Sequence, residues 1–183
     1  MKRFVFILLS MLISISCFSR SNMFLDIPYR VDINTFFDKM IEHGYIYSPE
    51  NSSEGRTYAF KGHFLDSNVW VIIECDPNEN LVYSVMVDFF SYAVPADGDD
   101  ASYQRLYSKY ESLKKWLQST DNDMTLSEES SREGVEKAFI LKQIIEGWSK
   151  IVWITIQKDG KRTLFLSFHD DRAIDHLLWG TDL

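Results

Sequence analysis

Cysteine, glycine and positive charge are scarce in this sequence, and each scarcity excludes a class of protein. Two cysteines in 183 residues cannot build the disulfide framework of a small secreted domain. The eight glycines form no Gly-x-Gly-x-x-Gly or Walker pattern, so the sequence contains no phosphate-binding glycine loop. With 19 Lys and Arg against 27 Asp and Glu, the net charge is −8, which argues against a nucleic-acid-binding protein because such proteins need a cationic surface.

Hydrophobic and aromatic residues are plentiful, and they indicate a folded domain. Hydrophobic residues make up 45% of the chain, and the aromatics include 13 Phe, 9 Tyr and 5 Trp. A solvated tail does not carry so much apolar surface, because it has no core in which to bury it. The chain is long enough for one domain, or for two small halves packed closely together.

The first residues are typical of an export signal. Lys2 and Arg3 are followed by an apolar run over residues 4–15, which is too short for a membrane-spanning helix. Small residues favour cleavage after residue 16, and an alternative cut follows Ser19. We therefore expect an extracytoplasmic protein, which is secreted, periplasmic or anchored to the cell envelope by a lipid.

The two cysteines have different interpretations. Cys17 directly follows the apolar run, where residues 13–16 loosely resemble the lipoprotein box of bacterial envelope proteins, although Ser14 stands where leucine is usual. It is either the lipidated residue, which would be the only membrane attachment, or part of the discarded signal. Cys75 ends an apolar run and has no cationic neighbour in sequence, which predicts a buried, unreactive thiol.

Helical spacing of apolar residues predicts two main helices. The first follows an exit segment over residues 17–31, begins with Asp32 as its N-cap and ends at Gly44. Within that exit segment, residues 24–28 are expected as a short edge strand that Pro28 ends. The second covers residues 100–118 and has acidic residues at its start. A last short helix is expected to start at Asp170 or Asp171 and to dock onto the sheet.

Strand-like patterns lie between and after these helices, and short turns join them. The expected strands are 57–65, 69–75, 81–92, 138–145, 149–157 and 163–168. Turns are expected at residues 66–68 and at Asp159-Gly160, the latter as a two-residue type I′ turn, with a mobile loop over 121–133. In the strand over 81–92, Ser84 and Asp88 alternate with apolar residues, so one face is buried and the other is wet or weakly covered.

Together these elements predict an α+β fold with antiparallel β-meanders and the two main helices packed on one face. Residues 32–183 then form a single domain. The same order, a helix followed by antiparallel strands, occurs over 32–95 and again over 96–183. No residue-level repeat accompanies this similarity of arrangement, so the sequence leaves open whether the two halves are a duplication.

The motifs for catalysis and metal binding are weak, and no cofactor is predicted. Ser112 and Lys115 match Ser-x-x-Lys by chance within a solvated helix face. The one concentration of metal-ligand types is His169, Asp171, Asp175 and His176. The competing interpretation is that the aspartates cap a helix and the histidines are solvated.

The Trp and Tyr side chains have two interpretations: most of them fill the core between the helices and the sheet, or some of them form a binding surface. Trp and Tyr are favoured where apolar area and hydrogen bonding are both needed, as on protein-binding faces. If helices cover only one face of the sheet, the other face presents aromatic residues to a partner. The candidate partner-binding residues are Trp70, Trp148 and Trp153.

Three segments also carry a resemblance to known proteins. Residues 24–28, with the sequence Phe-Leu-Asp-Ile-Pro, the helix segment 31–45 and the strand 82–89 resemble small exported bacterial proteins of uncharacterised role. The twofold helix-then-sheet order resembles the β-lactamase-inhibitor-like and outer-membrane-assembly-lipoprotein modules. This resemblance implies binding of a protein partner on a concave sheet, without catalysis, and it transfers no binding residue.

We therefore expect a non-catalytic extracytoplasmic module that binds a protein or an envelope component through an aromatic sheet surface. One alternative is a small exported hydrolase or metal-binding protein with a carboxylate and histidine site near the C-terminus. Another is a carrier of an apolar ligand, held between the helix 100–118 and the sheet.

Overall fold

The computed structural model of the chain describes residues 22–28, 30–53, 55–120, 125–127, 134–145 and 148–170, the backbone alone at 22, 23, 125–127, 145 and 148. Three expectations lie outside these residues: the export signal over 1–16, the role of Cys17, and the last helix, which would follow Asp170.

The described residues form two helices, one large sheet, a small hairpin and two 3-10 turns. In chain order the elements are β1 (Asn22–Phe24), β2 (Ile27–Pro28), α2 (Ile33–Glu42), β3 (Ile46–Tyr47), η2 (Pro49–Asn51), β4 (Thr57–Phe64), β5 (Ser67–Cys75), β6 (Val82–Asp88), η3 (Phe90–Tyr92), β7 (Val94–Pro95), α3 (Asp100–Thr120), β8 (Thr125–Ser127), β9 (Val135–Ile145), β10 (Trp148–Asp159) and β11 (Lys161–Asp170).

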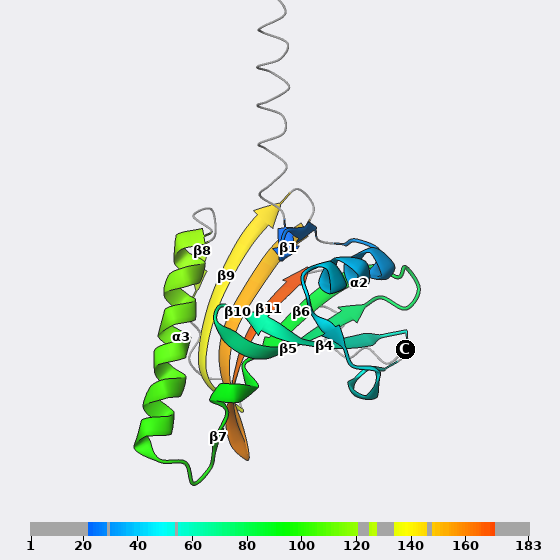
Figure 1. Ribbon diagram of the computed structural model, residues 1–183. Coiled ribbons are helices and arrows are strands. Elements are labelled where there is room, and N and C mark those ends of the chain that lie inside the picture. The colour runs from blue at the N-terminus through cyan, green and yellow to red at the C-terminus, as the bar shows by residue number, and fades with distance from the viewer. Residues whose placement is uncertain are drawn as a thin grey trace, which may run out of the picture.

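The large sheet is antiparallel throughout. Its strands lie in the order β3-β4-β5-β6-β11-β10-β9-β8, and β7 pairs with the far end of β11. The two meanders therefore meet at one seam, where β6 pairs with β11 in the register Met86 to Ser167. An antiparallel sheet with two main helices is an α+β fold, as the sequence predicts (Figure 1).

Helix α2 forms where the sequence predicts it. The Asp32 carboxylate accepts a hydrogen bond from the backbone N–H of Asn34 at 2.9 Å, and Gly44 follows the helix with φ +81°. Ile33, Phe36 and Met40 are buried on one stripe. This stripe carries the helix onto the β3–β4 end of the sheet.

Helix α3 lies at the other end of the sheet, alongside β9 in Figure 1. Asp99 caps it by accepting a hydrogen bond from the backbone N–H of Ser102 at 2.8 Å. Its buried stripe consists of Leu106, Tyr110, Leu113 and Leu117. Among the described helices, none combines the length and apolarity needed to cross a membrane.

Two hairpins turn at a Leu-Asp pair, which corrects the predictions for those segments. The turn between β4 and β5 is Leu65-Asp66 rather than residues 66–68, and both of its residues have positive φ, 45° and 59°. The segment 24–28, expected as a single edge strand, is likewise a hairpin that turns at Leu25-Asp26 with φ 48° and 59°. Local rules missed both turns because leucine rarely adopts a left-handed conformation.

Two further loop predictions need correction. The hairpin at residues 158–161 is present, but only Gly160 has positive φ (65°) while Asp159 does not. A type I′ turn needs both, so the predicted turn type is wrong. The segment 121–133, expected as a loop throughout, contains β8, which pairs with β9 in the register Leu126 to Leu141. Three residues at a sheet edge are too few for a periodicity to appear in the sequence.

Candidate binding face of the sheet

Alternate residues of the strands divide the large sheet into two faces. One face, the core face, packs against α2 and α3. A single row across it is completely buried, with 0% of each side chain exposed: Phe60, Val71, Val87, Leu166, Ile154 and Phe139. The buried stripes of both helices join these residues in one apolar cluster. Both helices therefore cover the same face, as the sequence predicts.

The opposite side, which we call the outer face, holds the residues in between. Three rows define it: Lys61, Trp70, Asp88, Phe165, Thr155 and Ala138; Ala59, Ile72, Met86, Ser167, Trp153 and Ile140; and Thr57, Glu74, Ser84, His169, Ile151 and Lys142. No described helix packs against these rows. Their large apolar members are all partly exposed: Trp70, Ile72, Met86, Phe165, Trp153, Ile140 and Ile151.

The outer face also holds polar atoms that are buried and have no hydrogen-bond partner. Such atoms occur on four described residues, and three of the four lie on this face: Asp88 Oδ1, Trp153 Nε1 and His169 Nδ1. The fourth, Gln143 Oε1, lies at the end of a core-facing row. Native proteins satisfy nearly all buried polar groups, so three such atoms on one face require an explanation.

Asp88 lies between two aromatic residues. Trp70 of β5 is directly opposite on one side and Phe165 of β11 on the other. Burial raises the pKa of the Asp88 carboxyl to about 6, although the positive charge of Lys161 opposes this shift. Among the described residues, no cation forms an ion pair with Asp88. Its carboxylate is consequently an ionisable acceptor whose hydrogen-bonding capacity is partly unused.

His169 and Trp153 form a second polar pair on the outer face. Their ring centroids lie 5.1 Å apart, on the neighbouring strands β11 and β10. Burial lowers the pKa of His169 to about 4, so the imidazole is neutral at pH 7. The pair thus presents a neutral ring and an indole N–H donor.

The structure places two of the three tryptophans predicted for binding on the outer face. Trp70 and Trp153 lie in adjacent rows of the outer face. Trp148 starts β10, but its side chain lies outside the described residues. Sequence reasoning missed Asp88 and Phe165 as neighbours of Trp70. The alternation of Asp88 with apolar residues indicated only that it belongs to the less covered side of its strand.

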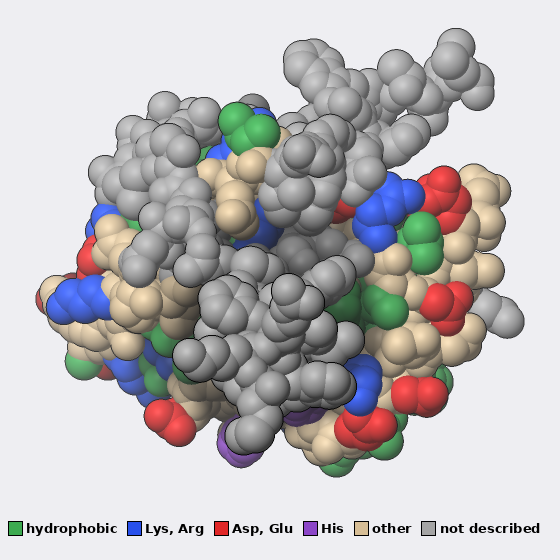
Figure 2. All heavy atoms as spheres, turned by 90° about the horizontal axis from the view of Figure 1, so that it is seen from above, with side chains coloured by type: hydrophobic (Ala, Val, Ile, Leu, Met, Phe, Trp, Pro, Cys, Tyr) green, Lys and Arg blue, Asp and Glu red, His purple; other side chains and the backbone are tan. Residues whose placement is uncertain are grey.

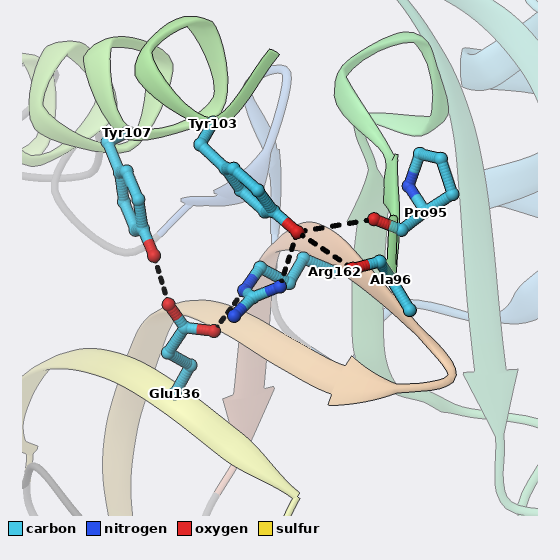
Figure 3. Close-up of polar contacts among 6 residues, drawn as sticks. All are labelled: Pro95, Ala96, Tyr103, Tyr107, Glu136 and Arg162. Atoms are coloured by element: carbon cyan, nitrogen blue, oxygen red, sulfur yellow. Dashed lines mark hydrogen bonds and ion pairs between the residues drawn. The ribbon is translucent and has the colours of Figure 1, made fainter. Parts of the chain in front are cut away.

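A polar network fastens α3 to the sheet at the other end of the core face (Figure 3). Glu136 of β9 accepts hydrogen bonds from the Tyr107 hydroxyl and from Arg162 Nε. Arg162 also donates to the Tyr103 hydroxyl at 2.9 Å, and that hydroxyl donates to the backbone oxygens of Pro95 and Ala96. Burial raises the pKa of Glu136, but the hydrogen bonds from Tyr107 and Arg162 outweigh it, so the pKa is lowered overall.

A shallow hollow of about 420 Å³ lies beside this network. Its walls come from one side of α3 and from Lys137, and they are Gln104, Tyr107, Ser108, Glu111, Ser112, Lys115 and Lys137. Lys137 lies over the Tyr107 ring at 4.8 Å, so its ammonium group is already engaged. Ser112 and Lys115 both border the hollow, but no hydrogen bond joins them in the described structure. The arrangement has the character of a solvated helix surface rather than of a nucleophile with its base.

The predicted metal site is represented by one residue. His169 lies on the outer face, whereas Asp171, Asp175 and His176 lie outside the described residues, and the part of the chain that is described contains no group of three metal-ligating side chains. Cys75 is 2% exposed and close to the backbone oxygens of Gly55 and Arg56. Burial raises the pKa of its thiol, which confirms the prediction of a buried, unreactive cysteine.

Charge is dispersed over the surface seen in Figure 2, where basic and acidic side chains alternate around the described region. That view shows no single cationic patch.

Comparison of the chain with protein-family models, with curated proteins and with solved structures gives no match in any of the three. Function is therefore inferred from the geometry of the outer face.

Proposed function

We propose that this protein is a non-catalytic, extracytoplasmic binding module whose outer face takes a protein or cell-envelope component. The observation that carries this proposal is the occurrence of three unpaired buried polar atoms, on Asp88, Trp153 and His169, within a partly exposed aromatic face. Such atoms do not stabilise the fold, because each unsatisfied buried polar group lowers the free energy of unfolding by about 1–3 kcal/mol.

The composition of the outer face suits a protein interface. Tryptophan is among the residues that contribute most to binding, because its large ring buries apolar area while its N–H forms a hydrogen bond. Trp70 on β5 and Trp153 on β10 provide two such rings. Ile72 and Met86 lie in the same row of the sheet as Trp153. A partner seated there covers the apolar area and brings hydrogen-bond donors to the Asp88 carboxylate.

The two alternatives have less support among the described residues. A hydrolase or metal centre needs converging ionisable groups, yet Asp88 and His169 lie four positions apart along the β6–β11 seam and do not converge. A carrier needs a cavity between α3 and the sheet. That space is filled by Leu106, Tyr110 and Leu113, which are at most 4% exposed.

We further propose that the domain consists of two equivalent halves, 32–95 and 96–183. Each half has a helix followed by strands, and the two halves pair through β6 and β11. A constant offset in residue number supports this. Positions at equal distance from the seam, on β4 and β9, β5 and β10, and β6 and β11, are always 81 residues apart: Ala59 and Ile140, Ile72 and Trp153, Met86 and Ser167. The outer face then joins corresponding surfaces of both halves, and Asp88 corresponds to His169.

We also propose that residues 1–16 direct export, with Cys17 either lipidated or removed with the signal. Metabolic labelling with radioactive palmitate distinguishes the two fates. Label that depends on Cys17 supports the lipid anchor, while a mature N-terminus at residue 20 shows that the cysteine is discarded.

The binding proposal is tested by affinity capture from the native cell envelope with the tagged full chain. The test variant is Trp153→Ala, which removes a ring from the outer face. The matched control is Ile41→Ala, because Ile41 is an apolar residue of α2, 47% exposed, that is remote from the outer face. Loss of a central tryptophan should weaken capture at least about tenfold, whereas the control should capture as the unaltered chain does.

Thermal denaturation of both variants establishes that they are folded before capture is compared. Equal capture by Trp153→Ala and the unaltered chain contradicts the proposal. So does recovery of the same proteins by the tag alone.

A further inference from the structure

We propose that Asp88, flanked by Trp70 and Phe165, is a binding site for one arginine side chain of the partner protein. This inference rests on the proposed function of the outer face and adds the chemistry of the group that the face recognises. It comes from the placement of a carboxylate between two rings in one row of the sheet.

The register brings the three side chains together. Residues directly opposite on neighbouring antiparallel strands have Cβ atoms about 4.5–5.5 Å apart, so the carboxylate has a ring on each side. All three residues are partly exposed, but Asp88 Oδ1 is buried, so a partner reaches the carboxylate through its other oxygen. Phe90, whose ring centroid is 6.5 Å from that of Trp70, extends the aromatic surface along the same side.

The Asp88 carboxylate lacks a hydrogen-bond or ion-pair partner among the described residues. Its Oδ1 atom is buried and has no hydrogen-bond partner. The nearby cations are otherwise placed: Lys61 lies over the Trp70 ring at 5.8 Å, and Lys161 acts on Asp88 only as a more distant charge. The stacking of Lys61 shows that a cation is already favourable against this indole.

An arginine fits this site better than other side chains do. Its planar guanidinium group can stack on an aromatic ring while its N–H groups donate charge-assisted hydrogen bonds to a carboxylate oxygen. A neutral partner group would leave the ionised carboxylate uncompensated. The net charge of −8 also favours a cationic partner over an acidic one.

The test is a titration of the full chain with n-butylguanidinium at pH 7.5, followed by the backbone amide signals in NMR spectra. n-Butylurea is the neutral control, since it has a similar shape and no charge. The variant is Asp88→Asn, which keeps the shape of the side chain. Glu74→Gln is the matched control, because Glu74 is an acid of the same face that lies opposite Thr57 and Ser84 instead of aromatic residues.

We expect saturable shifts at residues 70, 88 and 165 with n-butylguanidinium and none with n-butylurea. Asp88→Asn should weaken the binding at least about fivefold, while Glu74→Gln should leave it unchanged. The proposal is overturned by the absence of saturable shifts, by equal binding to Asp88→Asn, or by equal loss in Glu74→Gln.

Partner capture with the same variants separates this inference from the proposed function. If Trp153→Ala abolishes capture and Asp88→Asn does not alter it, the arginine site is contradicted while the binding face stands. If neither variant alters capture, both proposals are contradicted.

Discussion

The core face and the outer face of the sheet are made from alternate residues of the same strands, yet they differ in how deeply their side chains are buried. Val87 and Leu166 on the core face are completely buried among apolar neighbours. Asp88 and Phe165, one position away on the same two strands, remain partly exposed, and Asp88 has an unpaired oxygen. Within the described part of the chain, the strands therefore bury one face under both helices and leave aromatic side chains of the other face partly exposed.

The largest expected effect is a difference in stability between neighbouring residues of β11. Leu166→Ala creates a cavity beneath both helices and should lower the free energy of unfolding by about 3 kcal/mol. Phe165→Ala removes a larger side chain from the outer face and should lower the free energy of unfolding by only about 1 kcal/mol, because its site is partly open to solvent. Urea denaturation measures both, and equal losses would contradict the assignment of the two faces.

A second prediction tests how tightly the core face is packed. Gly62 of β4 approaches Tyr45 so closely that an added Cβ would lie 2.3 Å from the Tyr45 ring. Gly62→Ala should therefore lower the free energy of unfolding by about 2 kcal/mol, since the overpacked ring has to move. The double variant Gly62→Ala with Tyr45→Leu should recover part of that loss. An unchanged denaturation midpoint in Gly62→Ala would refute the close approach.

The third prediction concerns pH and the outer face. Burial lowers the pKa of His169 to about 4, so the folded state favours the neutral imidazole. This contribution is fully present above pH 6.5, the ordinary histidine pKa, and is lost as the pH falls towards 4. His169→Gln removes it, so the loss of unfolding free energy between pH 7 and 4.5 should be about 2 kcal/mol smaller in the variant. Identical pH profiles would show that His169 is not desolvated.

The smallest expected effect is the contribution of Asp88 to stability, which depends on pH in the opposite direction to that of His169. Burial raises the pKa of Asp88 to about 6, so the folded state favours the protonated carboxyl. Its contribution is present below pH 4, the ordinary aspartate range, and is lost as the pH rises through 6. Asp88→Asn should thus be more stable than the unaltered chain at pH 8, by about 1 kcal/mol because solvent screens the partly exposed group, and no different at pH 3.5. A destabilised variant at pH 8 would mean that the carboxylate has a partner within the chain.

Local patterns were sufficient to predict both helices and most strands. The N-cap at Asp32, the stripe of apolar residues in α3 and the alternation around Val85 and Val87 all depend on residues close in sequence. The Leu25-Asp26 and Leu65-Asp66 turns could not be predicted in this way, because their left-handed conformation is imposed by strand pairing against the usual preference of leucine.

The candidate site depends on contacts that no local pattern contains. Trp70 and Trp153 were recognisable as surface aromatics, since alternating strands with one covered face leave the other available. That Asp88 lies between Trp70 and Phe165 follows from the pairing of β5, β6 and β11, strands that are far apart in the chain. The register of such pairing is determined by burial of the whole core face, so the neighbours of Asp88 emerge only from the folded structure.

Photo-crosslinking from the outer face in the native envelope tests most directly whether a partner binds there. A benzoylphenylalanine at position 72, a partly exposed position in the same row of the outer face as Trp153, should form a light-dependent adduct of defined mass. The same probe at position 41 on α2 should form none, and Trp153→Ala should suppress the adduct at position 72. Absence of an adduct at position 72, or equal adducts at both positions, would contradict a partner bound on the outer face.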